Sequence, residues 1–306
     1  MRPAYNKGVA LLTALLITAL LATLAITLKW NNALDIRRTV VMLNRDQAIQ
    51  VALGAESWIQ NILRDDYEDD PDHDHLGEIW ASELPPLPID GGEIFGVIED
   101  LQGRFNVNNL IDANGDIDQE AQKQFQNLLN ALQLDPRFAG ITADWIDADD
   151  QASFPDGAED AIYTGFTPPY RAANQFLSNA SELGAIEGMD KESFDILSPH
   201  IVALPRHTGI NVNTATGPVL QSLSETMSVG DVESLFAARE GTGFTSLDIF
   251  DSYVEGALQE QLEESTSYFQ LKLIVRIDTV RITYYSILER GPQGDVTPIL
   301  RSLGTT

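Results

Sequence analysis

The segment "KGVALLTALLITALL", residues 7–21, decides how the rest of the chain is organised. The apolar run within it starts at Val9 and reaches Leu28 without a charged residue, a glycine or a proline. A helix of that length is roughly 30 Å long, which matches the hydrocarbon core of a bilayer. A secretory signal peptide has a shorter apolar core and a polar cleavage site, whereas Lys29 and Trp30 follow directly here. We therefore expect a membrane anchor that the mature protein keeps.

The same helix is expected to continue well beyond the membrane. No proline follows the span before Pro71, and the first glycine after it is Gly54. Small and apolar residues recur every seven positions on one helical face, at Val41, Ala48, Ala55 and Ile62. The pattern predicts a single helix from near Val9 to about Leu63, with a lipid-facing first half and an amphipathic second half.

Two distant segments have the pattern of β-strands. The first, "GGEIFGVIEDLQGRFNVN" (91–108), has short apolar alternations that indicate two strands. The second, "SYFQLKLIVRIDTVRITYYSILER" (267–290), is rich in β-branched and aromatic residues and predicts an antiparallel pair that turns near Asp278. The intervening sequence has the pattern of helices and loops, so we expect a helical domain inserted between the two pairs of strands.

Gly8 stands directly before the apolar helix and behind a short basic leader. This arrangement resembles the class III signal of type IV pilins and type II secretion pseudopilins, in which a prepilin peptidase cuts after the glycine, here between Gly8 and Val9. Most of those proteins carry a glutamate at the fifth mature position, where this chain has Thr13. In lacking that glutamate, the chain resembles the minor pseudopilin K family of type II secretion systems. Further segments similar to that family are "DLQGRFNVNNL" (100–110), "DWIDADD" (144–150), "GAED" (157–160), "PPYRAANQ" (168–175) and "INVNTA" (210–215).

The resemblance implies an α+β fold. A pilin-like long N-terminal helix is expected to pack on a small antiparallel sheet, with a large, mostly helical domain inserted into the sheet region. The expected divisions are a leader at 1–8, a transmembrane segment at 9–29, a pilin-like α/β domain at 30–105 and 266–306, and the inserted helical domain at 106–265 with a helix-hairpin-helix-like element near 209–250.

The resemblance also implies a function. It is that of a minor pseudopilin at the tip of the type II secretion pseudopilus, which initiates or caps assembly for the export of folded proteins. The expected location is the bacterial inner membrane, crossed once, with the body in the periplasm. The expected partners are the I- and J-type minor pseudopilins, the major pseudopilin and the prepilin peptidase. Two alternatives stay open, a minor pilin of a DNA-uptake or type IV pilus system and a membrane-anchored calcium-dependent hydrolase.

Charge and motif content argue against nucleic-acid binding and against catalysis. The net charge is −27, and the segment 222–262 has a single basic residue, Arg239, so the chain would repel a phosphate backbone. The chain has no H-E-x-x-H, G-x-S-x-G or P-loop motif, and its four histidines form no recognisable triad or zinc pattern. We expect neither an enzyme nor a nucleic-acid partner.

One acidic segment is expected to bind calcium. In "DWIDADDQASFPDGAEDAIY" (144–163), carboxylates crowd together at two places separated by a loop with proline and glycine. Such a cluster is costly unless a cation neutralises it, and Ca²⁺ takes six to eight oxygen ligands from flexible loops. The alternative is an exposed acidic loop, but the resemblance to the K family also implies bound calcium. The expected ligands are Asp147, Asp149, Asp150, Glu159 and Asp160.

Three further motifs are given structural interpretations. "RDDYEDDPDHDH" (64–75) is expected to be a solvated loop, with a metal site at His73, Asp74 and His75 as the alternative. "DANGDID" (112–118) lacks the glycine and glutamate of an EF-hand loop and predicts a turn that caps a helix at 119–133. The repeated N-V-N of 106–108 and 211–213 is expected to precede helices, each capped by the second asparagine of the motif or by the residue after it, Asn109 or Thr214.

Overall fold

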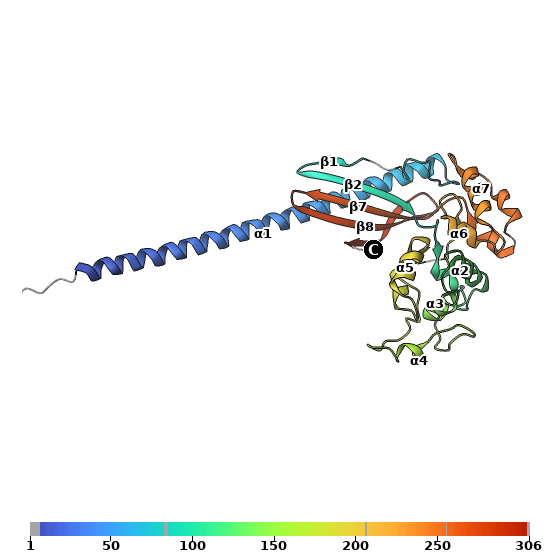
Figure 1. The fold of residues 1–306 in the computed structure, drawn as a ribbon. Helices are drawn as coiled ribbons and strands as arrows, with labels where there is room; N and C mark the ends of the chain where they lie inside the picture. The colour runs from blue at the N-terminus through green and yellow to red at the C-terminus, as the bar shows by residue number, and fades with distance from the viewer. Residues whose placement is uncertain (1–6, 83–84, 206, 255, 305–306) are drawn as a thin grey trace, which may run out of the picture.

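The computed structural model describes residues 7–82, 85–205, 207–254 and 256–304 (Figure 1). Its first element is α1, Lys7–Asp69, whose first half projects alone from the rest of the molecule. The single long helix is confirmed, although it continues past Leu63. The acidic residues after Leu63 do not end it, because Asp66 turns inward towards Arg290, and the helix stops just before Pro71. The expected leader lies mostly outside the described residues.

A five-stranded antiparallel sheet packs on the second half of α1. Its strands are, in spatial order, β1 Leu87–Ile89, β2 Gly92–Asp100, β7 Tyr268–Ile277, β8 Val280–Arg290 and β9 Val296–Leu303. The expected pair turning near Asp278 is confirmed: β7 and β8 form a hairpin, and Asp278 has a φ of +50°, a left-handed conformation that aspartate tolerates in tight turns.

Two strands were predicted in 91–108, and the second of them does not belong to this sheet. β3, Phe105–Asn106, pairs instead in parallel with β4, Ile201–Val202, inside the inserted region. The chain leaves the sheet at Gly103, where a Cβ would lie 2.6 Å from the hydroxyl oxygen of Thr214. Glycine allows this close approach of the chain to Thr214 just after β2 ends, where the insertion begins.

Small residues let α1 lie close to the sheet. Ala48 and Ala52 are completely buried, and Ile59 and Leu63 continue the same face. This face is rotated slightly from the predicted one, since Ala55 and Ile62 are half-buried whereas their neighbours Glu56 and Leu63 are buried. The facing strands contribute buried apolar residues, namely Ile94, Ile98, Phe269, Leu271, Leu273, Val275, Ile277, Tyr284 and Leu288. Trp80, from the segment after α1, completes this core against Phe269.

The inserted region lies between β2 and β7 and has its own core. The remaining elements are η1 Val107–Leu110, α2 Gln119–Ala131, α3 Phe138–Ile146, α4 Asp160–Tyr163, η2 Ala180–Ala185, α5 Lys191–Leu197, η3 Ser198–His200, β5 Ile210–Asn211, α6 Gly217–Ser222, α7 Val229–Arg239, η4 Leu247–Ser252, η5 Gly256–Gln261 and β6 Leu262–Glu263. The stacked rings of Phe105 and Phe125, 5.1 Å apart, lie in this second core. Asp118 caps α2 as predicted, because its side chain accepts the amides of Glu120 and Ala121. The α+β fold class with its helical insertion is confirmed.

Candidate functional site

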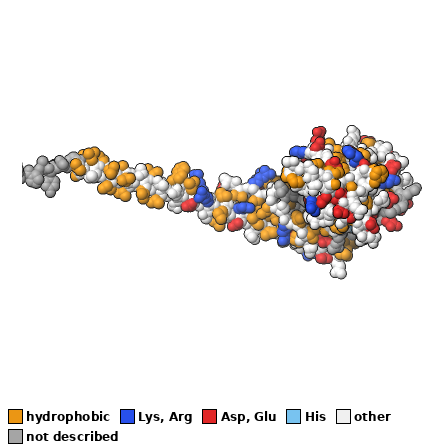
Figure 2. All heavy atoms as spheres, turned by 90° about the horizontal axis from the view of Figure 1, so that it is seen from below, with side chains coloured by type: hydrophobic (Ala, Val, Ile, Leu, Met, Phe, Trp, Pro, Cys, Tyr) orange, Lys and Arg blue, Asp and Glu red, His pale blue; other side chains and the backbone are white. Residues whose placement is uncertain are grey.

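The free half of α1 exposes an apolar surface. Every side chain from Val9 to Leu28 is exposed, and among the described helices α1 alone is long and apolar enough to cross a membrane. Figure 2 shows this apolar rod followed by basic side chains and then by a body on which acidic, basic and apolar side chains are mixed. The hydroxyl of Thr13 donates to the carbonyl of Ala10 at 3.0 Å, so the helix offers lipid no unpaired polar group there. The helix fits a single-pass membrane anchor.

The expected cleavage site lies at the start of this rod. Gly8 belongs to α1, so the peptide bond between Gly8 and Val9 lies within the helix. Thr13 is one and a half turns further along the same helix. Cleavage after Gly8 and an assembly role for position 13 stay predictions.

The acidic loop brings three of its five predicted residues together. Asp147 is the C-cap residue of α3 and Glu159 is the N-cap residue of α4. The acidic loop, residues 147–159, therefore runs from one helix end to the other. Carboxylate oxygens of Asp147, Asp149 and Glu159 all lie within 4.8 Å of one another. Asp147 and Glu159 are buried, whereas Asp149 is exposed.

The other two predicted residues lie differently. Asp150 is outside this group of three. Asp160 faces away from it, since one oxygen accepts the amide of Ala172 at 3.1 Å and the other pairs with Arg171 at 3.4 Å. Asp144 was missed by the sequence reasoning. It stands one turn before Asp147 on α3, is completely buried, and accepts the amide of Ser153 at 2.9 Å.

The electrostatics of the loop favour a bound cation. Burial, followed by repulsion from Asp144, raises the pKa of Asp147 to about 6. Burial, together with repulsion from Asp147 and Asp144, raises the pKa of Glu159 to about 7. Among the described residues, Asp144 Oδ1, Asp147 Oδ1 and Glu159 Oε1 are buried and accept no hydrogen bond. Unpaired carboxylate oxygens this close together are the ligands that a hard cation such as Ca²⁺ prefers.

A buried polar network joins the sheet to the insertion. Asp100 ends β2, is buried, and accepts the hydroxyl of Thr214 at 2.5 Å and the side-chain amide of Asn211 at 2.8 Å. Burial raises the pKa of Asp100 to about 6. Fixed contacts of this kind hold the two parts of the protein in one orientation.

The caps predicted for the N-V-N segments are wrong. In each segment the first asparagine closes the turn: Asn106 accepts the amide of Asn108 at 3.1 Å, and Asn211 accepts that of Asn213 at 3.0 Å. Thr214 is instead bound to Asp100, and the side-chain amide of Asn109 donates to the carbonyl of Thr208 at 2.8 Å. An asparagine side chain reaches an amide two residues ahead more easily than one further along, which explains the difference.

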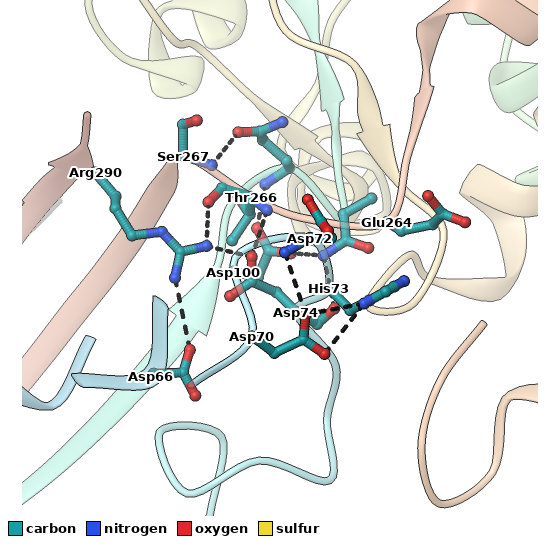
Figure 3. Close-up of polar contacts among 12 residues, drawn as sticks. Asp66, Asp70, Asp72, His73, Asp74, Asp100, Glu264, Thr266, Ser267 and Arg290 are labelled. Atoms are coloured by element: carbon teal, nitrogen blue, oxygen red, sulfur yellow. Dashed lines mark hydrogen bonds and ion pairs between the residues drawn. The ribbon is translucent and has the colours of Figure 1, made fainter. Parts of the chain in front are cut away.

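The segment 64–75 is not simply a solvated loop. Asp74 is completely buried, accepts the amide of Thr266 at 2.7 Å and pairs with Arg290 at the end of β8 (Figure 3). His73 pairs with Asp70 at 3.0 Å, so the two histidines of "HDH" do not converge on one metal site with Asp74. The partner of Asp74 is too distant in the sequence for local pattern to reveal it.

These features define a class of protein. A helix that is apolar and free in its first half and packed on an antiparallel sheet in its second half is the architecture of a pilin-like, membrane-anchored subunit. The large insertion between β2 and β7 distinguishes this chain within that class.

The chain belongs to the type II secretion system protein K family. Models of type II secretion system protein K match residues 103–206 and 210–271. The chain is 35% identical to protein K of Pseudomonas aeruginosa over 98% of this chain and 93% of that protein. It is 34% identical to protein K of Pectobacterium carotovorum, with 94% of each chain covered. It is therefore a minor pseudopilin of type II secretion, as the resemblance implied.

A solved structure agrees with this assignment. The fold matches a chain in the crystal structure of the GspK-GspI-GspJ complex from the type 2 secretion system of enterotoxigenic Escherichia coli. The TM-score is 0.77 at 26% identity, and the match covers 88% of this chain and 100% of that one. The same fold therefore extends over most of this chain.

Proposed function

We propose that this minor pseudopilin occupies the tip of the pseudopilus, with its body in the periplasm. The observation that carries the proposal is the position of the insertion. It leaves and re-enters the sheet beside Asp100 and Tyr268, at the end remote from the free half of α1 (Figure 1). A subunit stacked above would need that same volume for its own anchor helix. The insertion at this end of the subunit would hinder the addition of a further subunit, as expected of a protein that caps the fibre.

Thr13 supports the same position. Most proteins of the pilin-like class that this chain resembles have a glutamate at this position. That glutamate pairs with the terminal amine of a neighbouring subunit. A charged side chain in the bilayer is costly without such a partner, whereas the hydroxyl of Thr13 is satisfied by its own helix. A tip subunit has no neighbour above it, so a neutral residue is the better choice.

The partners we propose are the I- and J-type minor pseudopilins, followed by the major pseudopilin. The related E. coli chain was solved in a complex named for GspK, GspI and GspJ. In this chain, Ile36, Val40 and Leu43 line one face of α1 between the membrane and the sheet, and they are 56%, 42% and 61% exposed. Their i, i+4, i+7 spacing is that of a helix-packing seam. The seam fits helices of neighbouring subunits.

We also propose that the acidic loop holds calcium through Asp147, Asp149 and Glu159, with Asp144 close by. The three unpaired buried oxygens of this loop fit that ion. Bound calcium would join the end of α3 to the start of α4 electrostatically. Asp150 and Asp160, also predicted as ligands, are less well placed, since Asp160 is already engaged by Arg171.

Two alternatives have less support. A DNA-uptake pilin needs a basic surface, yet Arg239 donates to the carbonyls of Val212 and Ala215 at 3.0 and 2.7 Å, within the fold. A calcium-dependent hydrolase has no support from the relatives, which are type II secretion system proteins K. An assembly role without catalysis is the better conclusion.

Site-directed cross-linking tests the proposed partners, because the chain has no cysteine to interfere. Val40→Cys should form a disulfide with cysteines on the α1 face of an I- or J-type subunit in cells. Ser57→Cys, on the same helix and exposed, is the matched control and should not. Equal cross-linking at both positions, or none at Val40, would argue against the seam.

A further inference from the structure

A second group of carboxylates lies in the pilin-like part, away from the acidic loop. Asp66 comes from the last turns of α1, Asp74 from the loop after it, and Glu78 from the turn that follows. One carboxylate oxygen from each lies within 4.8 Å of the others. Three separate pieces of backbone therefore direct acidic groups at one point.

Burial makes this group different from a surface patch. The side chain of Asp74 is completely buried, and those of Asp66 and Glu78 are only 15% and 14% exposed. Asp74 Oδ2 is engaged by Thr266 and Arg290, but Asp74 Oδ1 accepts no hydrogen bond from any described residue. A fully buried carboxylate oxygen without a partner is costly, and it lies within a group of like charges.

The cations nearby do not balance the charge. Arg290 pairs with Asp74 and lies 3.5 Å from Asp66 Oδ2, so a single guanidinium serves two carboxylates (Figure 3). The imidazole of His75 is 3.7 Å from Glu78, and His73 is occupied by Asp70. Burial, followed by repulsion from Glu78 and Asp74, raises the pKa of Asp66 to about 7. With all three acids ionised, the group keeps a net charge of about −2.

We propose that Asp66, Asp74 and Glu78 bind a divalent cation of the Ca²⁺ type. Their oxygens match the preference of Ca²⁺ for six to eight oxygen ligands at flexible sites, and the partial exposure of two of them leaves room for water. The ion would connect the end of α1, through Asp74 and Arg290, to the start of β7 and the end of β8. This is where the insertion rejoins the sheet, so the ion would fix the insertion relative to the anchor helix.

Trp80 supplies a specific probe for this site. Its ring is buried, and its Nε1 donates to Glu78 Oε2 at 2.5 Å. Tb³⁺ replaces Ca²⁺ at oxygen-ligand sites and emits when a tryptophan within a few ångströms is excited. The full chain in detergent would be used, with Asp147→Asn and Glu159→Gln introduced to remove the acidic-loop site.

In this background we expect one Tb³⁺ per chain, with emission that Ca²⁺ displaces. Calorimetry should find the same single Ca²⁺. Asp66→Asn and Glu78→Gln, tested separately in case one fails to fold, should each weaken binding at least tenfold. Trp80→Phe should remove the emission but keep the Ca²⁺ seen by calorimetry. Asp65→Asn with Glu68→Gln changes exposed acids of the same helix end and is the matched control, with no expected effect.

Two results would overturn the proposal. One is that the Asp147→Asn, Glu159→Gln protein is folded, as judged by circular dichroism, but binds neither Tb³⁺ nor Ca²⁺. A proton on Asp66 would then reduce the negative charge of the group in place of a cation. The other is unchanged Ca²⁺ affinity in folded Asp66→Asn and Glu78→Gln. Neither result bears on the acidic loop, which is tested separately.

Discussion

Glu56 of α1 and Arg301 of β9 form an ion pair, with Glu56 Oε1 2.6 Å from Arg301 Nη2. The hydroxyl of Tyr284 on β8 donates to the other oxygen of Glu56. Glu56 is only 1% exposed, so this contact buries one charge between the anchor helix and the last two strands. Burial alone would raise the pKa of Glu56, but the bonds from Arg301 and Tyr284 lower it overall.

The first prediction concerns this ion pair. Arg301→Met should lower the free energy of unfolding by about 1–2 kcal/mol. A fully buried pair would cost about 3–5 kcal/mol, but water screens the half-exposed Arg301. Urea unfolding of the full chain in detergent measures the change. Arg276→Met, which breaks the exposed pair with Glu93, is the control and should cost less than about 0.5 kcal/mol. Similar losses in both variants would refute a special role for Glu56.

The second prediction concerns calcium in the acidic loop. Calcium at a hundredfold excess over its Kd should stabilise the protein by about 2.7 kcal/mol, because it binds only the folded state. We expect thermal unfolding at a higher temperature in calcium than in chelator, and a smaller difference in Asp147→Asn with Glu159→Gln. Asp150→Asn, outside the group of three, should behave as the unmodified protein does. An unmodified protein that melts identically in both solutions would exclude the metal.

The third prediction is the pH dependence without calcium. Asp147 and Glu159 have pKa values of about 6 and about 7 in the folded state, above the values of about 4 expected when unfolded. The folded protein therefore binds more protons, and its stability falls as the pH rises from about 4 to about 7. Chelated protein should melt at a lower temperature at pH 7.5 than at pH 5. The melting temperature should fall less steeply with pH in Asp147→Asn with Glu159→Gln. An unchanged dependence on pH would contradict the raised pKa values assigned to these two residues.

The fourth prediction concerns processing at Gly8. Gly8→Leu should leave an uncut precursor in the membrane fraction, because the anchor from Val9 to Leu28 is unchanged. Immunoblotting of cell fractions distinguishes the two lengths. Lys7→Arg keeps the leader charge and should be cut normally. Mature-sized protein from Gly8→Leu would disprove the expected cleavage site.

Local sequence was sufficient for the main elements of the fold. A long stretch without proline predicted α1, and two β-branched segments predicted the β7–β8 hairpin. β9 was not predicted, since it is an edge strand that contains Pro298 and alternates only weakly in hydrophobicity. Edge strands depend on the neighbour they pair with more than on their own pattern.

Contacts distant in sequence account for what was missed at the sites. The burial of Asp74 depends on Arg290, and the role of Thr214 depends on Asp100. No local pattern reveals such partners. Three acids of the loop lie close together, because Asp147 and Glu159 stand at two helix ends that approach each other, whereas the direction of Asp160 is set by Arg171. Asp144 could have been found from its i, i+3 relation to Asp147 on a helix.

The central claim is that this chain caps the pseudopilus, and its location on the fibre tests that claim most directly. Pseudopili sheared from cells would be labelled with gold through a tag after Thr306 and examined by electron microscopy. The account predicts label at one end of each fibre, at about one particle per fibre, while a tag on the major pseudopilin labels the whole length. Label from this chain at regular intervals along the fibre would contradict it.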